Sequence, residues 1–535
     1  MIDRFVPTAR RRILVLFWML VASWFGAKNA ATAKPPNILV VLTDDQRHDA
    51  MGFLGHPWLE TPSMDRLARE GVHFANAFVT TSLCSPSRAS IFTGLYTHNH
   101  RVADNYHAIS DKLVYFPRYL QKAGYETAFI GKWHMGGDVD DPRPGFDHWV
   151  SFKGQGVYVA DPSKAKVKGR PVPLSSAEGY NVDGERRPQP GYITDELTDF
   201  SLDWLRERAA SDKPWFLFLS HKAVHSDFIP ANRHAFRYEE KPFELPKTWF
   251  ELPEAFRDVP MWVQNQRNSR HGVEFAYNAA SFDMATFYRR YCETLLAVDE
   301  GLGKLLALLT EQGSLDDTVV LYLGDNGFQF GEHGLIDKRT AYEESMRIPM
   351  LMRAPMLTNG EGGRRVDRVV ANIDIAPTLL DIAGIEPPAH MDGRSFLPLV
   401  KGEDVPWRDY LLYEYYWEHN YPHTPTMHAI RGERFKYIRY HGIWDVDELY
   451  DLQADPRETT NLIADPARAD TVAELDRRLF EILEETGGDT MPLLTNPGAR
   501  FPHRRAGGTK AAEFPSWLEK DSAPTGTSPS PEPGK

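Results

Sequence analysis

The chain has 535 residues, 42% of them hydrophobic, which is enough for a globular protein with a large core and two or more domains. Its net charge of −13 argues against a nucleic-acid-binding protein, because such proteins present basic surfaces to the phosphates. On a chain this acidic, an anionic substrate would need a basic pocket of its own.

The N-terminus predicts export. Residues 1–33 combine four arginines, an uncharged apolar run over 13–27 and a small-residue cleavage site at 31–33. The apolar run is shorter than the roughly 20 residues of a membrane-spanning helix. We therefore expect a cleaved signal peptide, a periplasmic or extracellular protein and no stable membrane insertion. An uncleaved anchor and a twin-arginine export route remain alternatives.

The two cysteines cannot form the disulfide framework that many exported proteins have. Cys292 lies in an apolar helical stretch and is expected in the core. Cys84 begins the segment Cys-Ser-Pro-Ser-Arg-Ala-Ser-Ile-Phe-Thr-Gly, where a helix is predicted to start. A helix N-terminus favours anions and lowers the pKa of a thiol, and the Arg88 guanidinium can hold an oxyanion. By itself, the pattern also fits a structural cysteine before an ordinary helix.

Four continuous apolar runs predict strands that are buried on both faces of a mostly parallel sheet. They cover residues 37–42, 127–130, 215–219 and 318–323. Polar residues follow each run, at the strand ends where open α/β sheets bind ligands. In chain order these residues are Asp44 and Asp45, Lys132 and His134, His221 and His225, and Asp325 and Asn326. An Asp-Asp pair or an Asp-Asn-Gly turn would be a weak signal without the others.

Helical periodicity alternates with these strands and completes an α/β pattern. The predicted helices cover 62–71, 116–124, 197–208, 288–311 and 374–384, the last with Asp374 as its cap. Residues 137–187 are rich in glycine, proline and charged residues, and they predict a long loop over the site.

After Pro406 the chain becomes rich in aromatic and β-branched residues, which is typical of antiparallel strands. Residues 411–417 and 427–440 predict such strands, with a turn at 431–433, and residues 471–483 predict a closing helix. The end of the chain is dominated by Ser, Thr, Pro and Gly, so we expect a disordered tail over 496–535.

Three of these segments together resemble the signatures of the type I sulfatases. They are Cys-x-Pro-Ser-Arg followed by Thr-Gly at 84–94, Gly-Lys-Trp-His at 131–134 and Gly-Asp-Asn-Gly at 324–327. The resemblance runs from about residue 36 to 465. It implies an alkaline-phosphatase-like α/β fold, with a mixed sheet flanked by helices, and a smaller α+β subdomain with an antiparallel sheet. We expect the catalytic domain to span 34–404 and the C-terminal subdomain 405–495.

The same resemblance implies the nucleophile and the cofactor. A formylglycine-generating, or sulfatase-maturating, enzyme would oxidise Cys84 to formylglycine, whose hydrate attacks sulfur. The metal ligands would be the modified Cys84 together with Asp44, Asp45, Asp325 and Asn326. Since the last four offer only oxygen, one Ca²⁺ per chain is expected in preference to Mg²⁺ or Zn²⁺.

The resemblance also implies catalytic roles for basic residues. His225, with Lys338 as a candidate partner, would protonate the departing alcohol, and His134 would act as the base. The cations that neutralise the sulfate oxygens would be Arg88, Lys132 and Lys338. The family usually has Lys-Ala-Pro-His where this chain has Lys-Ala-Val-His at 222–225, so His221 remains the alternative acid.

The predicted function is hydrolysis of sulfate esters on a carbohydrate, and segments such as Asp-Lys-Arg at 337–339 resemble bacterial N-acetylglucosamine-6-sulfatase-like polysaccharide sulfatases. One alternative is a phosphonate or phosphate ester hydrolase of the same superfamily. Another is an inactive carbohydrate-binding homologue. Sugar contacts are expected in the aromatic segment 414–428, including Trp417 and His428, which is otherwise a partly exposed hairpin.

Overall fold

The computed structural model describes residues 34–168, 178–248, 259–265, 283–419, 421–441 and 445–489. The predicted signal peptide at 1–33 and the predicted tail at 496–535 lie outside these ranges. Within them, no helix is both long and apolar enough to cross a membrane.

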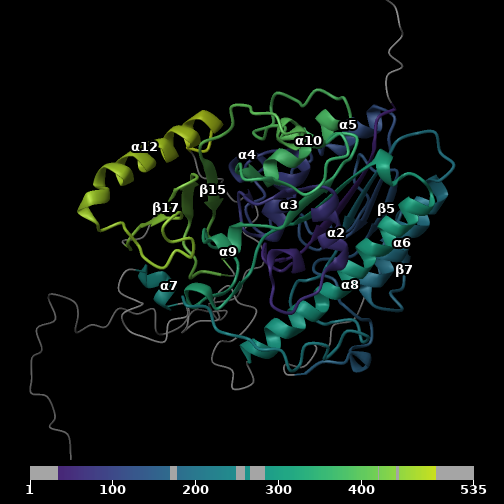
Figure 1. Ribbon diagram of the computed structural model, residues 1–535, viewed down its shortest axis with the longest axis horizontal. Helices are drawn as coiled ribbons and strands as arrows, with labels where there is room; N and C mark the ends of the chain where they lie inside the picture. The colour runs from purple at the N-terminus through teal and green to yellow at the C-terminus, as the bar shows by residue number, and fades with distance from the viewer. Residues whose placement is uncertain are drawn as a thin grey trace, which may run out of the picture.

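A ten-stranded mixed sheet forms the centre of the larger domain (Figure 1). In order across the sheet, its strands are β13 (Arg364–Val366), β2 (Val72–Phe74), β12 (Met350–Arg353), β9 (Thr318–Gly324), β1 (Asn37–Thr43), β8 (Trp215–Ser220), β4 (Glu126–Gly131), β5 (His148–Ser151), β6 (Tyr180–Val182) and β7 (Glu185–Arg187). The five strands from β9 to β5 are parallel, whereas β12 and β6 run antiparallel to their neighbours. The four strands predicted from apolar runs are therefore adjacent at the centre of the sheet.

Helices cover both faces of this sheet because the central strand is apolar on both sides. Ile38, Val40 and Leu42 of β1 pack into one core, and Leu39 and Val41 pack into the other. On the first face lie α3 (Cys84–Thr93), α5 (Pro117–Lys122) and α10 (Ile375–Ile382). On the second face lie α2 (Pro62–Glu70), α6 (Ile193–Arg208) and α8 (Met284–Glu311), which also holds the buried Cys292.

A smaller antiparallel sheet follows in the chain, with α12 (Ala469–Thr486) packed against it (Figure 1). Its strands are β15 (Leu411–Tyr415), β16 (Met427–Arg431), β17 (Phe435–Tyr440) and β18 (Glu448–Asp451). The predicted fold class, with its turn between β16 and β17, is confirmed. The boundary expected at 404–405 remains a prediction; it falls between Lys401, the last residue of α11 (Leu397–Lys401), and Leu411.

The remaining elements are short. The strands are β3 (Ala77–Phe78), β10 (Gln329–Phe330), β11 (Ile336–Asp337) and β14 (Val370–Ala371). The helices are α4 (Thr97–His100), α7 (Met261–Asn265) and α9 (Glu343–Met346).

One local prediction is wrong, and a second is right only in part. Residues 137–187 are not one long loop, because β5, β6 and β7 extend the main sheet there, with Trp149 and Val150 of β5 buried. Asp374 does occupy the N-cap position of α10, but its side chain makes no capping hydrogen bond to the helix. Its carboxylate accepts the N–H groups of Ala371 and Arg394 instead, so it ties two loops together.

The register of the central strands brings their carboxyl ends to one edge. Thr43 pairs with Gly324, and Ser220 pairs with both Leu42 and Gly131. The residues that follow β1, β4, β8 and β9 therefore meet in space, as a parallel arrangement of strands requires.

Gly131, the last residue of β4, allows the closest of these approaches. Its φ is +124°, and a Cβ added there would lie 1.8 Å from the Ser220 carbonyl oxygen. The same oxygen accepts the N–H of Lys132 at 2.8 Å. A side chain at 131 would therefore push β4 away from β8 and move Lys132.

We expect Gly131→Ala to lower the free energy of unfolding by about 2–5 kcal/mol, from left-handed backbone strain plus overpacking, and to lower kcat. Chemical denaturation and steady-state kinetics measure the two effects. Gly55→Ala is the matched control, because Gly55 also has a positive φ, +86°, but no described atom lies within 4 Å of the added Cβ. Equal destabilisation by both substitutions would contradict the close-packing explanation.

Candidate active site

Cys84 is the first residue of α3 and is fully buried. Its Sγ lies 3.2 Å from Lys338 Nζ and 3.5 Å from Asp44 Oδ1. The next residue, Ser85, donates its backbone N–H to Asn105 Oδ1 at 3.0 Å, which fixes the start of the helix. Burial and the Asp44 charge raise the pKa of the Cys84 thiol. The lowered pKa predicted from the helix N-terminus is therefore wrong, because desolvation by burial is the largest cause of the shift.

Three buried carboxylates surround this cysteine. Asp44 and Asp45 follow β1, Asp325 follows β9, and one oxygen of each lies within 4.8 Å of the others. The Asp45 N–H donates to Asp325 Oδ1 at 3.1 Å. Asn326 donates its amide to Asp45 Oδ1 at 2.6 Å, while its own Oδ1 is buried without a hydrogen-bond partner among the described residues. These are oxygen donors of the kind that hard divalent cations prefer.

Three buried cations balance the three carboxylates. Arg88 donates to Asp325 Oδ2 at 2.9 Å and to Asp44 Oδ2 at 3.1 Å. Lys132 forms an ion pair with Asp44, and Lys338 forms one with Asp45. Burial would raise the pKa of Asp44, but positive charges led by Lys132 hold that pKa well below its usual range. Burial and the Asp44 charge raise the pKa of Asp325 to about 6.

Of the two candidate acid histidines, the structure brings His225 to this cluster. Its Nε2 lies 3.9 Å from Asp45 Oδ2, and its ring belongs to a group of possible metal ligands with Asp44 and Cys84. Its Nδ1 lies 2.9 Å from the Ser226 carbonyl oxygen. His221 is buried elsewhere: neither ring nitrogen has a hydrogen-bond partner among the described residues, and burial lowers its pKa to about 4.

His134 lies close to the start of α3. Its backbone carbonyl accepts a hydrogen bond from Ser85 Oγ at 2.5 Å, and its side chain is 5% exposed. Burial and the Lys132 charge lower the pKa of His134 well below its usual value. The ring is therefore neutral at pH 7 and can accept a proton.

Gln155 is a site residue that sequence reasoning missed. Its Oε1 accepts a hydrogen bond from Lys132 Nζ at 2.5 Å, which brings the segment after β5 into the site. The sequence gives no signal for it, because it stands between two glycines in a stretch without hydrophobic periodicity.

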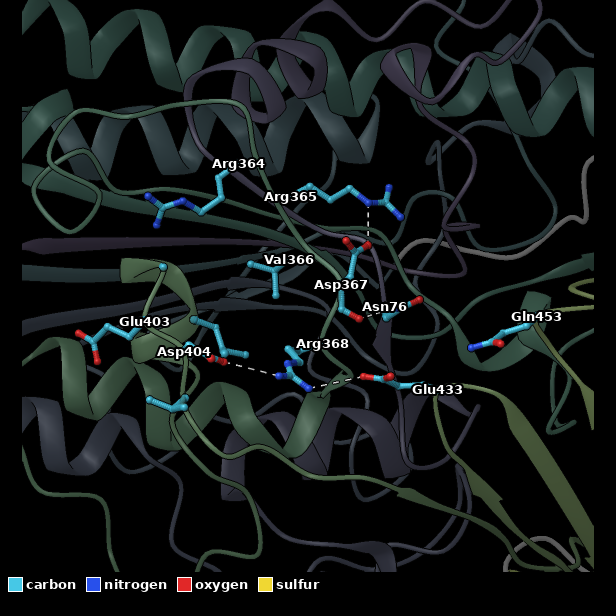
Figure 2. A pocket seen from close by; sticks show the side chains of 13 residues that line it. Asn76, Arg364, Arg365, Val366, Asp367, Arg368, Glu403, Asp404, Glu433 and Gln453 are labelled. Atoms are coloured by element: carbon cyan, nitrogen blue, oxygen red, sulfur yellow. Dashed lines mark hydrogen bonds and ion pairs between the residues drawn. The ribbon is translucent and has the colours of Figure 1, made fainter. Parts of the chain in front are cut away.

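A separate hollow of about 520 Å³ lies at the edge strand β13 (Figure 2). Arginines line it, but each of those drawn there is close to an acidic or carbonyl oxygen. Arg368 lies between Asp404 and Glu433, at 3.7 and 3.6 Å, and Arg365 donates to Asp367 at 2.7 Å. This hollow shares no residue with the cluster around Cys84 and has no excess of positive charge.

Both the sheet domain and the C-terminal part of the chain match known protein families. Residues 36–385 match the family described as Sulfatase, and residues 331–485 match the domain described as N-sulphoglucosamine sulphohydrolase, C-terminal. The chain is 33% identical to N-acetylglucosamine-6-O-sulfatase of Bacteroides thetaiotaomicron, over 85% of this chain and 86% of that protein.

Two solved structures are similar along nearly their whole length. One is described as BT4656 in complex with its substrate D-glucosamine-2-N,6-O-disulfate, with 31% identity, a TM-score of 0.73, and coverage of 86% of this chain and 99% of that one. The other is the phosphonate monoester hydrolase of Agrobacterium radiobacter, with 25% identity, a TM-score of 0.69, and coverage of 84% and 96%. Together with the family match over residues 36–385, this places the chain in the sulfatase family, as a sulfuric ester hydrolase.

Proposed function

We propose that this sulfatase removes sulfate from carbohydrates, and that its substrate is a 6-O-sulfated N-acetylglucosamine at a chain end. The observation that carries the proposal is the position of Cys84, between the buried Asp44 and the buried Lys338. The substrate class is supported by the similarity to an N-acetylglucosamine-6-O-sulfatase. It is also supported by the similarity to a structure whose substrate carries a 6-O-sulfate.

The proposal includes one Ca²⁺, held by Asp44, Asp45, Asp325, Asn326 and the modified side chain at 84. The donor set fits, because it is made of carboxylate and amide oxygens and leaves Asn326 Oδ1 without another partner among the described residues. When bound, the ion would polarise a sulfate oxygen and neutralise negative charge. Zinc would prefer nitrogen and sulfur ligands.

Residue 84 is the proposed nucleophile. The Cys84 thiol is a poor one, because its raised pKa keeps it protonated. Oxidation to formylglycine by a maturation enzyme would replace it with a hydrated aldehyde, whose hydroxyl can attack sulfur.

The basic residues have separate proposed roles. Arg88, Lys132 and Lys338 bind the sulfate oxygens. His225 gives a proton to the departing alcohol from Nε2, since Nδ1 faces the Ser226 carbonyl. Burial and Lys132 lower the pKa of His225 in the protein alone, whereas the negative charge of a bound sulfate ester favours the protonated ring. His134, neutral at pH 7, then takes the proton from the second hydroxyl of the hydrate, so that the aldehyde re-forms and its C–O bond to sulfate breaks, which releases sulfate.

Export through the signal peptide at 1–33, and a periplasmic or extracellular location, remain part of the proposal. Phosphonate or phosphate ester hydrolysis is the second candidate, and the similarity to a phosphonate monoester hydrolase favours it. That similarity is lower in both identity and TM-score than the similarity to the structure with a sulfated substrate. An inactive binding protein is disfavoured, because all six acidic and basic groups around Cys84 are in place.

We expect active enzyme from its native host to carry formylglycine at position 84, as detected by peptide mass spectrometry. Cys292 provides an internal control in the same digest, because this buried residue of α8 should remain a thiol. Cys84→Ala should lower kcat by about three orders of magnitude or more, since the nucleophile is lost. Fully active protein with only a thiol at 84 would contradict the mechanism.

We expect chelation to abolish activity and Ca²⁺ to restore it better than Zn²⁺. Independently of activity, Ca²⁺ at 100 times its Kd should stabilise the fold by about 2.7 kcal/mol, measured as a shift of the thermal unfolding curve. Asn326→Ala and Asp325→Ala should reduce this shift. Asp140→Asn is the control, since Asp140 is buried, is paired with Arg186 at 2.6 Å and belongs to none of the groups of possible metal ligands among the described residues. An undiminished shift in Asn326→Ala would contradict the ligand assignment.

On a panel of substrates, kcat/KM should be at least about tenfold higher for N-acetylglucosamine-6-sulfate than for its 3-sulfated isomer, because the sugar supplies the extra binding energy. Aryl sulfates should be hydrolysed faster than the matching aryl phosphonates. A preference for the phosphonates would favour the second candidate function.

Substitution of Trp417 tests whether the aromatic segment 414–428 binds the sugar. Trp417 is 43% exposed, whereas His428 is buried and its Nδ1 lies 2.9 Å from His441 Nε2. The sugar contact at His428 remains a prediction, and Trp417 is the more accessible of the two residues. Trp417→Ala should lower kcat/KM on the sulfated sugar, with little effect on an aryl sulfate. Phe480→Ala, at an equally exposed aromatic on α12, should change neither.

A further inference from the structure

Lys338 lies in a backbone segment that must be held in place by its surroundings. The residues on either side of it, Asp337 and Arg339, have φ values of +100° and +78°. Neither is glycine, so this conformation is costly and persists only where other contacts fix it. Lys338 itself contacts Cys84 Sγ and Asp45, so the position of its ammonium group depends on this segment.

The Arg339 side chain is the main anchor of the segment. It forms a buried ion pair with Asp337 in the same segment, and its further side-chain contacts come from the C-terminal subdomain. The guanidinium is buried, donates from Nε to Glu418 Oε1 at 2.9 Å and stacks 3.7 Å from the centre of the Tyr421 ring. Glu418 is also buried, and the Tyr415 hydroxyl donates to the same Oε1 at 2.6 Å. Tyr415 ends β15, while Glu418 and Tyr421 lie in the connection to β16.

Resting on the proposed role of Lys338, we propose that Glu418 is a positioning residue for the sulfatase reaction. Through Arg339, it sets the place of Lys338 beside residue 84, so the C-terminal subdomain completes the active site. Trp417, the exposed aromatic residue proposed to contact the sugar, is the neighbour of Glu418. The same loop therefore presents a sugar-binding surface and holds a cation of the sulfate site.

A role in positioning explains why the ion pair between Arg339 and Glu418 is buried. A buried ion pair adds little net stability, because desolvation of both charges offsets their attraction. A hydrogen-bonded pair in a fixed geometry does restrict where the attached backbone can lie. Arg339 and Glu418 are 79 positions apart in the chain, so their contact fixes one domain against the other.

The test is a double-mutant cycle on the full-length, matured enzyme with an activated aryl sulfate as substrate. Glu418→Gln keeps the shape and one acceptor for Arg339 but removes the charge. We expect it to lower kcat about tenfold and to change KM less than twofold, because Lys338 moves relative to the reacting atoms. In a Lys338→Met background, the same substitution should lower kcat less than twofold, since the group it positions is absent.

Arg408→Met provides a matched control, because it removes another buried ion pair, between Arg408 and Asp374. We expect it to lower the melting temperature without changing kcat. If Glu418→Gln does not fold, Tyr415→Phe removes only the hydroxyl that holds Glu418. It should give a loss of about threefold that also disappears in the Lys338→Met background.

The positioning role would be overturned if Glu418→Gln lowered kcat equally in the wild-type and Lys338→Met backgrounds. It would also be overturned if neither Glu418→Gln nor Tyr415→Phe lowered kcat. Both outcomes would leave the sulfatase function intact. A matured wild-type enzyme that hydrolyses no sulfate ester would instead contradict the proposed function, and with it the role of Lys338.

Discussion

The compensation of buried charge at the edge of the main sheet is the constraint on which this structure depends. Asp44, Asp45 and Asp325 are almost completely buried, and an unpaired carboxylate in such a place is very costly. Their partners Arg88, Lys132 and Lys338 come from α3, from the end of β4 and from the loop after β11. Five separate segments of the chain must therefore meet for the charges to cancel. The register of the parallel strands brings together the three that follow β1, β4 and β9, and packing of α3 and of the loop after β11 adds the other two.

This balance also suits the chemistry. A site with equal numbers of fixed positive and negative groups gains positive charge when a divalent cation binds, and it can then accept a sulfate ester that the chain as a whole, at −13, would repel. Because the groups already hold one another in place, little reorganisation is needed when the substrate arrives. Stabilisation by such preorganised groups is usually the largest contribution to catalysis of this kind.

The sequence predicts the central strands and most of the site, because continuous apolar runs mark β1, β4, β8 and β9 and polar residues follow directly. It does not predict β5 to β7, whose three or four residues are too short to stand out in a segment rich in glycine and proline. The sequence also does not predict that the pKa of Cys84 is raised, because desolvation depends on atoms from distant parts of the chain. The same is true of Gln155 and Glu418, which act through single long-range contacts.

These long-range contacts bear on how the two domains are related. The two family matches overlap over residues 331–385, and Lys338 lies inside the overlap. Buried ion pairs cross between the domains at several places, such as His98 with Glu414, Arg339 with Glu418 and Glu343 with Lys436, each at 2.9 Å. Separating the domains would leave these charges buried without partners or expose the apolar surface around them. The buried ion pairs therefore join the C-terminal subdomain firmly to the sheet domain, and through the proposed role of Lys338 this contact also supports the active site.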